Sequence, residues 1–265
     1  MKKPDYKNWV PKSMVIGLGA ATAASAGLSV LFGATDRILK GRARQIAAAT
    51  FGIAAQVLLF YTAWMGALHS VFDYNGKRKL AKTIIDGTAD FVTIPDGGTG
   101  LDVGCGSGAL TIACARRNPK AQMLGCDIWS GAYQAVFTKK RCEENAAAEG
   151  VSNVRFEEGN AIRLPFPDES FDAVTSNYVY HNIAGHNKQQ LLRETLRVLK
   201  KGGTFAIHDL MSKARYGDMD AFAESLMKDG YEAVQLIDTT DGRFMSSKEA
   251  AFLGLGGSTL LVGRK

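Results

Sequence analysis

The stretch LDVGCGSGA, residues 101–109, places three glycines within five positions, between an apolar run and a helical pattern. Glycine adopts left-handed backbone angles and has no side chain, so such a turn lets backbone N–H groups approach a ligand at the start of a helix. An acidic residue, Asp102, stands two positions before the first of these glycines, Gly104. The stretch therefore predicts a loop that binds a small molecule where a strand meets a helix.

Two ligand classes fit this loop. The glycines that begin at Gly104 loosely match G-x-G-x-x-A, which resembles the dinucleotide fingerprint of dehydrogenases. The pattern D-x-G-x-G-x-G, which begins at Asp102, is typical instead of the S-adenosylmethionine loop of methyltransferases. Asp127 closes the next apolar run about 20 residues later, where a carboxylate can accept hydrogen bonds from ribose hydroxyls. Both ligands contain a ribose, so Asp127 does not discriminate between them.

The chain beyond these glycines alternates between short apolar runs and helical patterns. Strands are predicted at 100–104, 121–127, 154–160, 171–178, 204–210, 231–240 and 258–265, and helices at 108–118, 130–150, 187–203 and 217–230. Strands separated by helices form parallel sheets with helices on both faces. The sequence therefore predicts an α/β fold with a doubly wound, mostly parallel sheet, in which ligands bind beyond the carboxyl ends of the strands.

A third pattern separates the two ligand classes. The segment EEGNAIRLPFPDESFDAVTSNYVYHNI places Asn160 after the third strand and an acidic turn before the fourth, and LRETLRVLKKGGTFAIHDL follows it. Together with the glycine loop and Asp127, these segments closely resemble the class I S-adenosylmethionine-dependent methyltransferases. The resemblance is nearest to the small-molecule branch that includes the ubiquinone and menaquinone C-methyltransferases, and it extends over residues 77–265.

This resemblance implies a Rossmann-like sheet of seven strands, the last of them antiparallel, and S-adenosylmethionine as the cofactor. By the same resemblance, Asp102 would support the loop and the cofactor's amino group, Asp127 would hold the ribose, and Asn177 would lie near the methionine end. The other expected contacts are Gly104, Cys105, Gly106 and Gly108 around the methionine, Ile128 and Trp129 against the adenine, and Asn160 and Ala161 at the adenine edge. The family often has Asp at Asn160, but an amide can still accept a bond from the adenine amino group.

Methyl transfer from a sulfonium needs alignment of donor and acceptor, and a base where the acceptor loses a proton. His181, which follows the fourth strand, is the first candidate for that base, and His208 and Asp209 close the fifth strand. Tyr178 and Tyr180 either line the acceptor site with their rings or belong to the core. The sequence shows no Cys and His grouping with zinc spacing, so no metal is expected.

Two other functions stay open, an NAD(P)-dependent oxidoreductase and a cofactor-binding membrane scaffold without catalysis. The sequence lacks the Tyr-x-x-x-Lys pair of short-chain dehydrogenases, which weighs against the oxidoreductase. The net charge of the chain is +6, but basic clusters within 1–13, 34–45 and 73–82 leave the remaining residues 83–265 mildly acidic. A nucleic-acid substrate calls for a basic face, so none is expected.

Two uncharged runs, residues 14–33 and 46–68, are each long enough to cross a bilayer as a helix. The alternatives are a pair of buried helices and, for the first run, a signal peptide. Basic residues flank both runs, where they would meet anionic lipid headgroups. We expect an N-terminal membrane-anchor region, residues 1–72, and a methyltransferase domain, residues 73–265, that faces the cytoplasm.

The anchor suggests an acceptor that partitions into lipid, with membrane lipid as a further partner. The small residues Gly19, Ala23 and Gly27 recur at every fourth position and allow close helix contact, within one chain or in a homodimer. Deleting residues 1–70 is expected to leave a soluble domain that still binds the cofactor.

Overall fold

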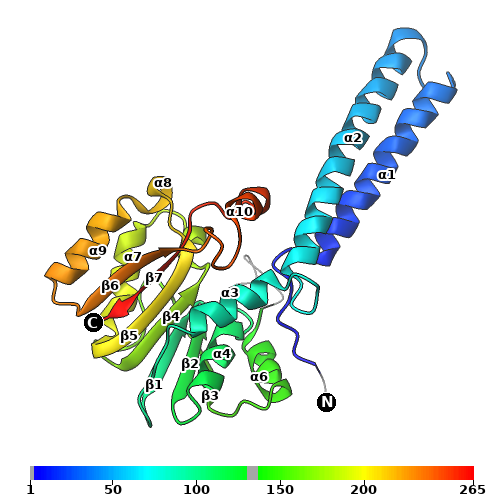
Figure 1. The fold of residues 1–265 in the computed structure, drawn as a ribbon. Coiled ribbons are helices and arrows are strands. Elements are labelled where there is room, and N and C mark those ends of the chain that lie inside the picture. Colours follow the sequence, from blue (N-terminus) through cyan, green and yellow to red (C-terminus); the bar gives the residue numbers. More distant parts are fainter. Residues whose placement is uncertain (1–2, 130–136) are drawn as a thin grey trace. The chain divides into compact units, whose positions relative to one another are not determined.

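The computed structural model describes residues 3–129 and 137–265, which divide into two compact units (Figure 1). One unit is an N-terminal helical hairpin, residues 8–81. The other unit, called here the sheet domain, comprises residues 82–265 together with the N-terminal residues up to Lys7. The expected domain boundary between residues 72 and 73 stays a prediction; by contacts, the hairpin unit runs to Ala81 and the first residues of the chain group with the sheet domain.

The hairpin consists of helix α1 (Lys12–Ala34) and helix α2 (Gly41–Phe72), which lie side by side. Small and hydroxyl side chains form their contact. The hydroxyls of Thr22 and Thr62 lie 3.2 Å apart, and Ser29 donates a hydrogen bond of 2.8 Å to the carbonyl of Ala48. A β-carbon on Gly19 would meet the Thr62 methyl at 3.8 Å, so this member of the small-residue series faces the partner helix of the same chain.

Both helices are long and apolar enough to cross a membrane, by length and composition. Helix α2 has 32 residues and is therefore about 48 Å long, which exceeds the roughly 30 Å hydrocarbon core of a bilayer. It begins five residues before the uncharged run, and its first turns carry Arg42 and Arg44. Large apolar side chains such as Ile16, Val30 and Phe60 are more than 60% exposed, so the hairpin surface is apolar.

The seven strands of the sheet domain are β1 (Thr99–Val103), β2 (Gln122–Asp127), β3 (Val154–Glu158), β4 (Phe171–Asn177), β5 (Leu199–Leu210), β6 (Ala233–Asp238) and β7 (Ser258–Arg264). They form one sheet in the order β3-β2-β1-β4-β5-β7-β6. All neighbours are parallel except β7, which runs antiparallel to β5 and to β6. This confirms the predicted fold class, and it places the reversal of strand order between β1 and β4, where ligands bind in such sheets.

The helices are α3 (Leu80–Ala89), α4 (Ala109–Arg117), α6 (Lys139–Ala148), α7 (Lys188–Arg197), α8 (Lys213–Tyr216), α9 (Met219–Lys228) and α10 (Ser247–Leu253), with a 3-10 turn η1 (Tyr180–Asn182). Helix α4 packs on β2, α6 on β3, α7 on β5 and α9 on β6. The core between these elements is made of aliphatic and aromatic side chains with no more than 2% exposure, among them Leu101, Leu124, Phe205 and Ile207.

Two predicted helices differ from the structure. The helix predicted at 130–150 begins at Lys139, where the Thr138 side chain accepts the Arg141 N–H, and residues 130–136 lie outside the described ranges. The helix predicted at 187–203 ends at Arg197, because Leu199 already pairs with Phe171 in the sheet. The ladder then shifts register and resumes at Thr204, so the Lys-Lys-Gly-Gly run forms a bulge in β5 rather than the end of a helix.

Asp102 ties the centre of the sheet domain together. Its carboxylate is 1% exposed and accepts hydrogen bonds from the hydroxyls of Thr111 in α4, at 2.7 Å, and Thr175 in β4, at 2.9 Å. Burial raises its pKa from the ordinary 3.8 to about 7, although both hydroxyls lower it. The strand that leads into the glycine loop, the helix that leaves it and the neighbouring strand therefore meet at one side chain.

Asp102→Asn is expected to make the unfolding temperature less sensitive to pH. Because the folded state raises this pKa, the carboxyl's contribution is fully present below about pH 3.8 and is lost as the pH rises through about 7. A pKa shift of this size corresponds to a change of about 4 kcal/mol in the free energy of unfolding between the two pH limits. The neutral amide of asparagine does not titrate, and it offers one acceptor and one donor to the two hydroxyls. Melting curves of the full chain in detergent between pH 4 and 8 measure the difference.

Asp172→Asn is the matched control, because the pKa of this carboxyl moves the other way. Partial burial raises its pKa, but the Thr99 N–H and Lys200 together hold it below the ordinary value. Its contribution is present above that value and is lost towards acid pH, so the control should be most destabilised near neutrality. A common response of both variants would contradict the role of Asp102.

Candidate cofactor and acceptor site

The three glycines of the loop have positive φ angles of 71° at Gly104, 56° at Gly106 and 83° at Gly108. A β-carbon on Gly104 would lie 2.3 Å from a methyl of Val179, and one on Gly108 would lie 3.1 Å from the Phe156 ring. A β-carbon on Gly106 would find its nearest atoms, in the ring of Phe137, only at 3.7 Å. Gly104 and Gly108 are thus needed for packing, whereas Gly106 is half-buried and has no neighbour close enough to clash with a β-carbon.

Asp127, at the end of β2, is half-buried and reaches this loop. Its carboxylate accepts the N–H of Gly106 at 2.9 Å and the N–H of Trp129 at 2.8 Å. The Trp129 indole N–H in turn donates to the carbonyl of Gly106 at 3.1 Å. An ionised carboxylate offers about four acceptor positions, so Asp127 keeps capacity for the hydroxyls of a ligand.

The residues expected at the adenine lie at the ends of β2 and just beyond β3. Ile128 is 51% exposed, Trp129 is half-buried and Asn160 is exposed, whereas Ala161 is buried. The Asn160 side-chain oxygen accepts the N–H of Ile162 at 2.9 Å and so holds a local turn. Cys105 is also buried, and burial raises the pKa of its thiol, which makes it a neutral packing residue of the loop.

The ends of β4 and β5 bring a histidine and an aspartate together. His181 Nδ1 lies 2.5 Å from an oxygen of Asp209, a residue with no exposed surface. Burial would raise the pKa of Asp209, but its hydrogen bonds with His181 and the Leu210 N–H hold that pKa below its usual value. Asp209 therefore keeps the proton on Nδ1, and the structure gives Nε2 no hydrogen-bond partner among the described residues. This is the arrangement of an oriented general base.

His208 does not fit the catalytic role predicted for it. Its ring has no exposed surface, and its two nitrogens lie 2.9 Å from the Asn177 side chain and 2.9 Å from the Thr239 hydroxyl. Burial lowers the pKa of His208 to about 3, so it stays neutral as a bridge between β4 and the end of β6. Asn177, expected near the methionine end, is half-buried and makes this contact from the end of β4.

The two tyrosines have different positions. Tyr180 is fully buried and its hydroxyl lies 2.6 Å from that of Thr195, so it belongs to the core and does not line an acceptor site. Tyr178 is half-buried, has a strained φ of 54°, and its ring lies 5.9 Å from the His181 ring. Strained residues of this kind concentrate at functional sites, so Tyr178 remains a candidate for the acceptor wall.

Sequence reasoning missed Tyr216, in the short helix α8. Its side chain is buried, and burial together with the neighbouring Asp209 carboxylate raises the pKa of its hydroxyl. Tyr216 thus lies beside Asp209, the partner of His181. A four-residue helix carries too little periodicity to be recognised in the sequence.

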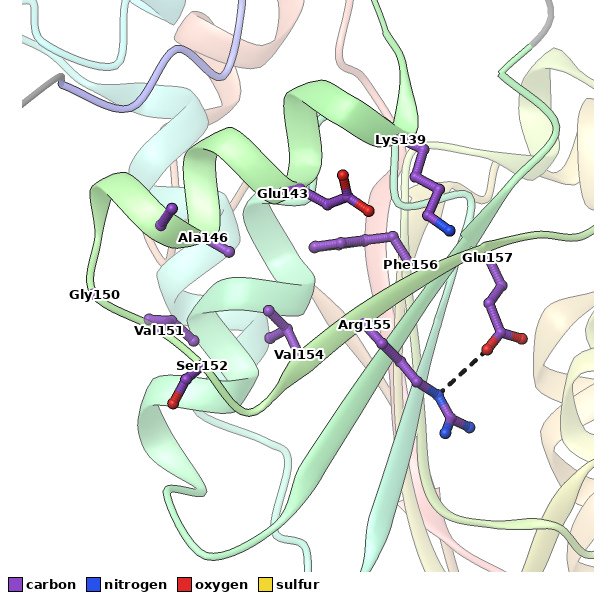
Figure 2. A pocket seen from close by; sticks show the side chains of 11 residues that line it. Lys139, Glu143, Ala146, Gly150, Val151, Ser152, Val154, Arg155, Phe156 and Glu157 are labelled. Carbon is purple, nitrogen blue, oxygen red and sulfur yellow. Dashed lines mark ion pairs between the residues drawn. The ribbon is translucent and has the colours of Figure 1, made fainter.

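A separate shallow hollow lies on the edge-strand side of the sheet domain, between α6 and β3 (Figure 2). Its lining includes Lys139, Glu143 and an ion pair of 3.5 Å between Arg155 and Glu157. None of the residues that line it is an expected cofactor contact. Among the residues that the structure describes, no group of three or more His, Cys, Asp or Glu side chains could hold a metal ion.

Known sequences support the resemblance to methyltransferases. Residues 101–207 match the family described as a methyltransferase domain. The demethylmenaquinone methyltransferase of Deinococcus radiodurans is 38% identical over 107 residues, which are 40% of this chain and 41% of that protein. The corresponding protein of Bacillus licheniformis is 34% identical over 137 residues, or 51% of this chain and 53% of its own length. The chain thus spans about half the length, or less, of these relatives.

Known structures agree on the fold. The cyclase SpnF has a TM-score of 0.53 and 22% identity, over 71% of this chain and 82% of its own. A geranyl diphosphate methyltransferase in complex with GPP and sinefungin has a TM-score of 0.52 and 18% identity, over 71% and 79% of the two chains. One fold thus serves two activities in these neighbours. Residues 101–207 thus match a methyltransferase domain, and the seven-stranded sheet built around them has the fold of these neighbours.

Proposed function

We propose that the sheet domain binds S-adenosylmethionine at the carboxyl ends of β1, β2 and β3 and methylates a small acceptor. The observation that carries this proposal is the pairing of Gly106 with Asp127. The Gly106 N–H donates to the half-buried Asp127 carboxylate, which keeps further acceptor positions beside the glycine loop. Ile128 and Asn160 continue the exposed surface along the neighbouring strand ends.

The cofactor, when bound, would supply a methyl group on a positively charged sulfur. That sulfur is a good leaving group and needs no acid, because it becomes a neutral thioether. The chain has to orient the two partners and to accept a proton where the acceptor carries one. Asp127 orients the ribose end, and the glycine loop positions the methionine end. His181 Nε2 takes the proton, because Asp209 holds the ring with its other nitrogen protonated.

The acceptor that we propose is a lipophilic small molecule of the quinone type. The relatives with the name demethylmenaquinone methyltransferase support this class of acceptor. The two apolar helices support an enzyme that works at a membrane, where such a molecule partitions. The catalytic domain then faces the cytoplasm, where the cofactor is made.

Asp127→Ala tests the cofactor site. Removal of the ribose partner should weaken the binding of S-adenosylmethionine by about 1–3 kcal/mol, which is about 5- to 150-fold. Isothermal calorimetry on the full chain in detergent measures this change. Asp220→Ala, an exposed carboxylate in α9, is the control and should bind as the wild type does. A wild type that binds a nicotinamide cofactor and not S-adenosylmethionine would show that the proposed function is wrong.

His181→Ala tests the base. Loss of a positioned base should lower turnover by about 10²- to 10⁴-fold while cofactor affinity changes less than twofold. Asp209→Asn should lower turnover in the same way, because an amide does not hold the ring in the required tautomer. Transfer of labelled methyl from the cofactor into a whole-lipid extract, compared with aqueous metabolites, gives the rate and the acceptor class. Equal loss of affinity and turnover would assign His181 a structural role instead.

The orientation of the hairpin can be tested with single cysteines, because all four native cysteines are buried. If both helices span the membrane, the connection after α1 lies outside and the segment after α2 lies in the cytoplasm. In sealed cytoplasm-out vesicles, an impermeant maleimide should label Asn75→Cys at once and Asp36→Cys only after detergent is added; both positions are exposed. Labelling of Asp36→Cys from the cytoplasmic side would exclude a hairpin that spans the membrane with both helices. The result is informative because the basic residues near Asp36 violate the positive-inside rule.

A further inference from the structure

The first described residues of the chain, 3–7, dock on the sheet domain and form what we call the N-terminal strap. Tyr6 is 6% exposed, and its hydroxyl donates a hydrogen bond of 2.7 Å to Glu149 at the end of α6. The Asp5 N–H donates to the Asn145 side chain at 2.7 Å, and Arg141 donates to the Asp5 carboxylate at 2.8 Å. Three side chains of one helix face thus hold the strap.

The strap also touches the glycine loop. Ser107, which stands between Gly106 and Gly108, donates its hydroxyl hydrogen to the carbonyl of Tyr6 at 2.8 Å. The Asn145 amide donates to the carbonyl of Asp5 at 3.2 Å and to the carbonyl of Ser107 at 3.0 Å. Asn145 and Ser107 are 2% and 6% exposed, so these bonds are shielded from water. One buried amide therefore joins the strap to the loop.

Helix α6, which holds the strap, also contacts the glycine loop at Gly106. The Cys142 thiol of α6 donates to the carbonyl of Gly106 at 3.2 Å. A loop with three glycines at positive φ has large conformational freedom when nothing holds it. Ordering such a loop on binding reduces affinity, whereas contacts that order it beforehand increase affinity.

We propose that the strap is a positioning element of the cofactor site: residues 3–7 and Asn145 order the loop around Ser107 before the ligand arrives. The proposal rests on the proposed function, since it concerns the same loop. It also adds to one expectation from the sequence. A domain made by deleting residues 1–70 lacks the strap, so it should bind S-adenosylmethionine more weakly than the full chain does.

The test uses the full chain in detergent micelles. Tyr6→Phe removes the bond to Glu149, and Arg141→Ala removes the ion pair with Asp5; neither side chain belongs to the loop. Each variant should weaken S-adenosylmethionine binding about fivefold, the effect of one lost hydrogen bond of ordinary strength. Arg193→Ala is the matched control, because it removes an ion pair of 2.7 Å with Asp229, between α7 and the end of α9. Its affinity should stay within twofold of the wild type.

Hydrogen exchange of residues 104–108 without ligand separates the two proposals. It should be faster in Tyr6→Phe and Arg141→Ala and unchanged in Arg193→Ala, whatever ligand the site takes. A synthetic peptide of residues 1–9, added to a chain that lacks 3–7, should restore both the slow exchange and the affinity. Variants with wild-type exchange and wild-type affinity overturn the strap proposal. A wild type that fails to bind S-adenosylmethionine overturns the proposed function and leaves the exchange result to decide on the strap.

Discussion

The buried carboxyl of Asp102 is the contact on which the rest of the sheet domain depends. It lies at the reversal of strand order and accepts hydrogen bonds from the hydroxyls of Thr111, in the first turn of α4, and Thr175, in β4. A buried ionisable group destabilises the fold unless hydrogen bonds satisfy it. The raised pKa of Asp102 shows that burial disfavours its charged form. Because β1, α4 and β4 are joined there, the loop between β1 and α4 has fixed ends. The glycines can then hold their left-handed backbone angles within a fixed surrounding structure.

Much of this arrangement follows from local sequence. The alternation of apolar runs and helical patterns predicts the strand sequence, and the glycine loop and Asp127 are recognisable because each is a short motif at a strand end. The burial of a side chain depends on residues far away in the sequence, and it decides which candidate histidine can act as a base. His181 and His208 are both candidates in the sequence. In the structure, His181 Nε2 has no hydrogen-bond partner among the described residues, whereas both ring nitrogens of His208 are hydrogen-bonded inside the sheet. The strap escapes sequence reasoning for the same reason, since Asp5 and Asn145 are separated by 140 positions.

The two ends of the candidate site differ in how firmly each is built. The cofactor end consists of backbone and short side chains held by sheet and helix, which suits a ligand that stays the same throughout a family. The proposed acceptor end consists of Tyr178, His181 and the short helix α8, all of them outside the regular sheet. Variation of acceptors on one fold is expected to arise in such segments.

The large separation in sequence between the strap and α6 has a consequence for synthesis. Tyr6 leaves the ribosome long before its partners, because Glu149 is 143 positions further along. At about 5–20 residues per second, roughly 7 to 30 seconds pass between the synthesis of Tyr6 and that of Glu149, and both apolar helices emerge in that time. The strap can therefore dock only once α6 has been made, and the glycine loop gains its contact with the strap at that point or later.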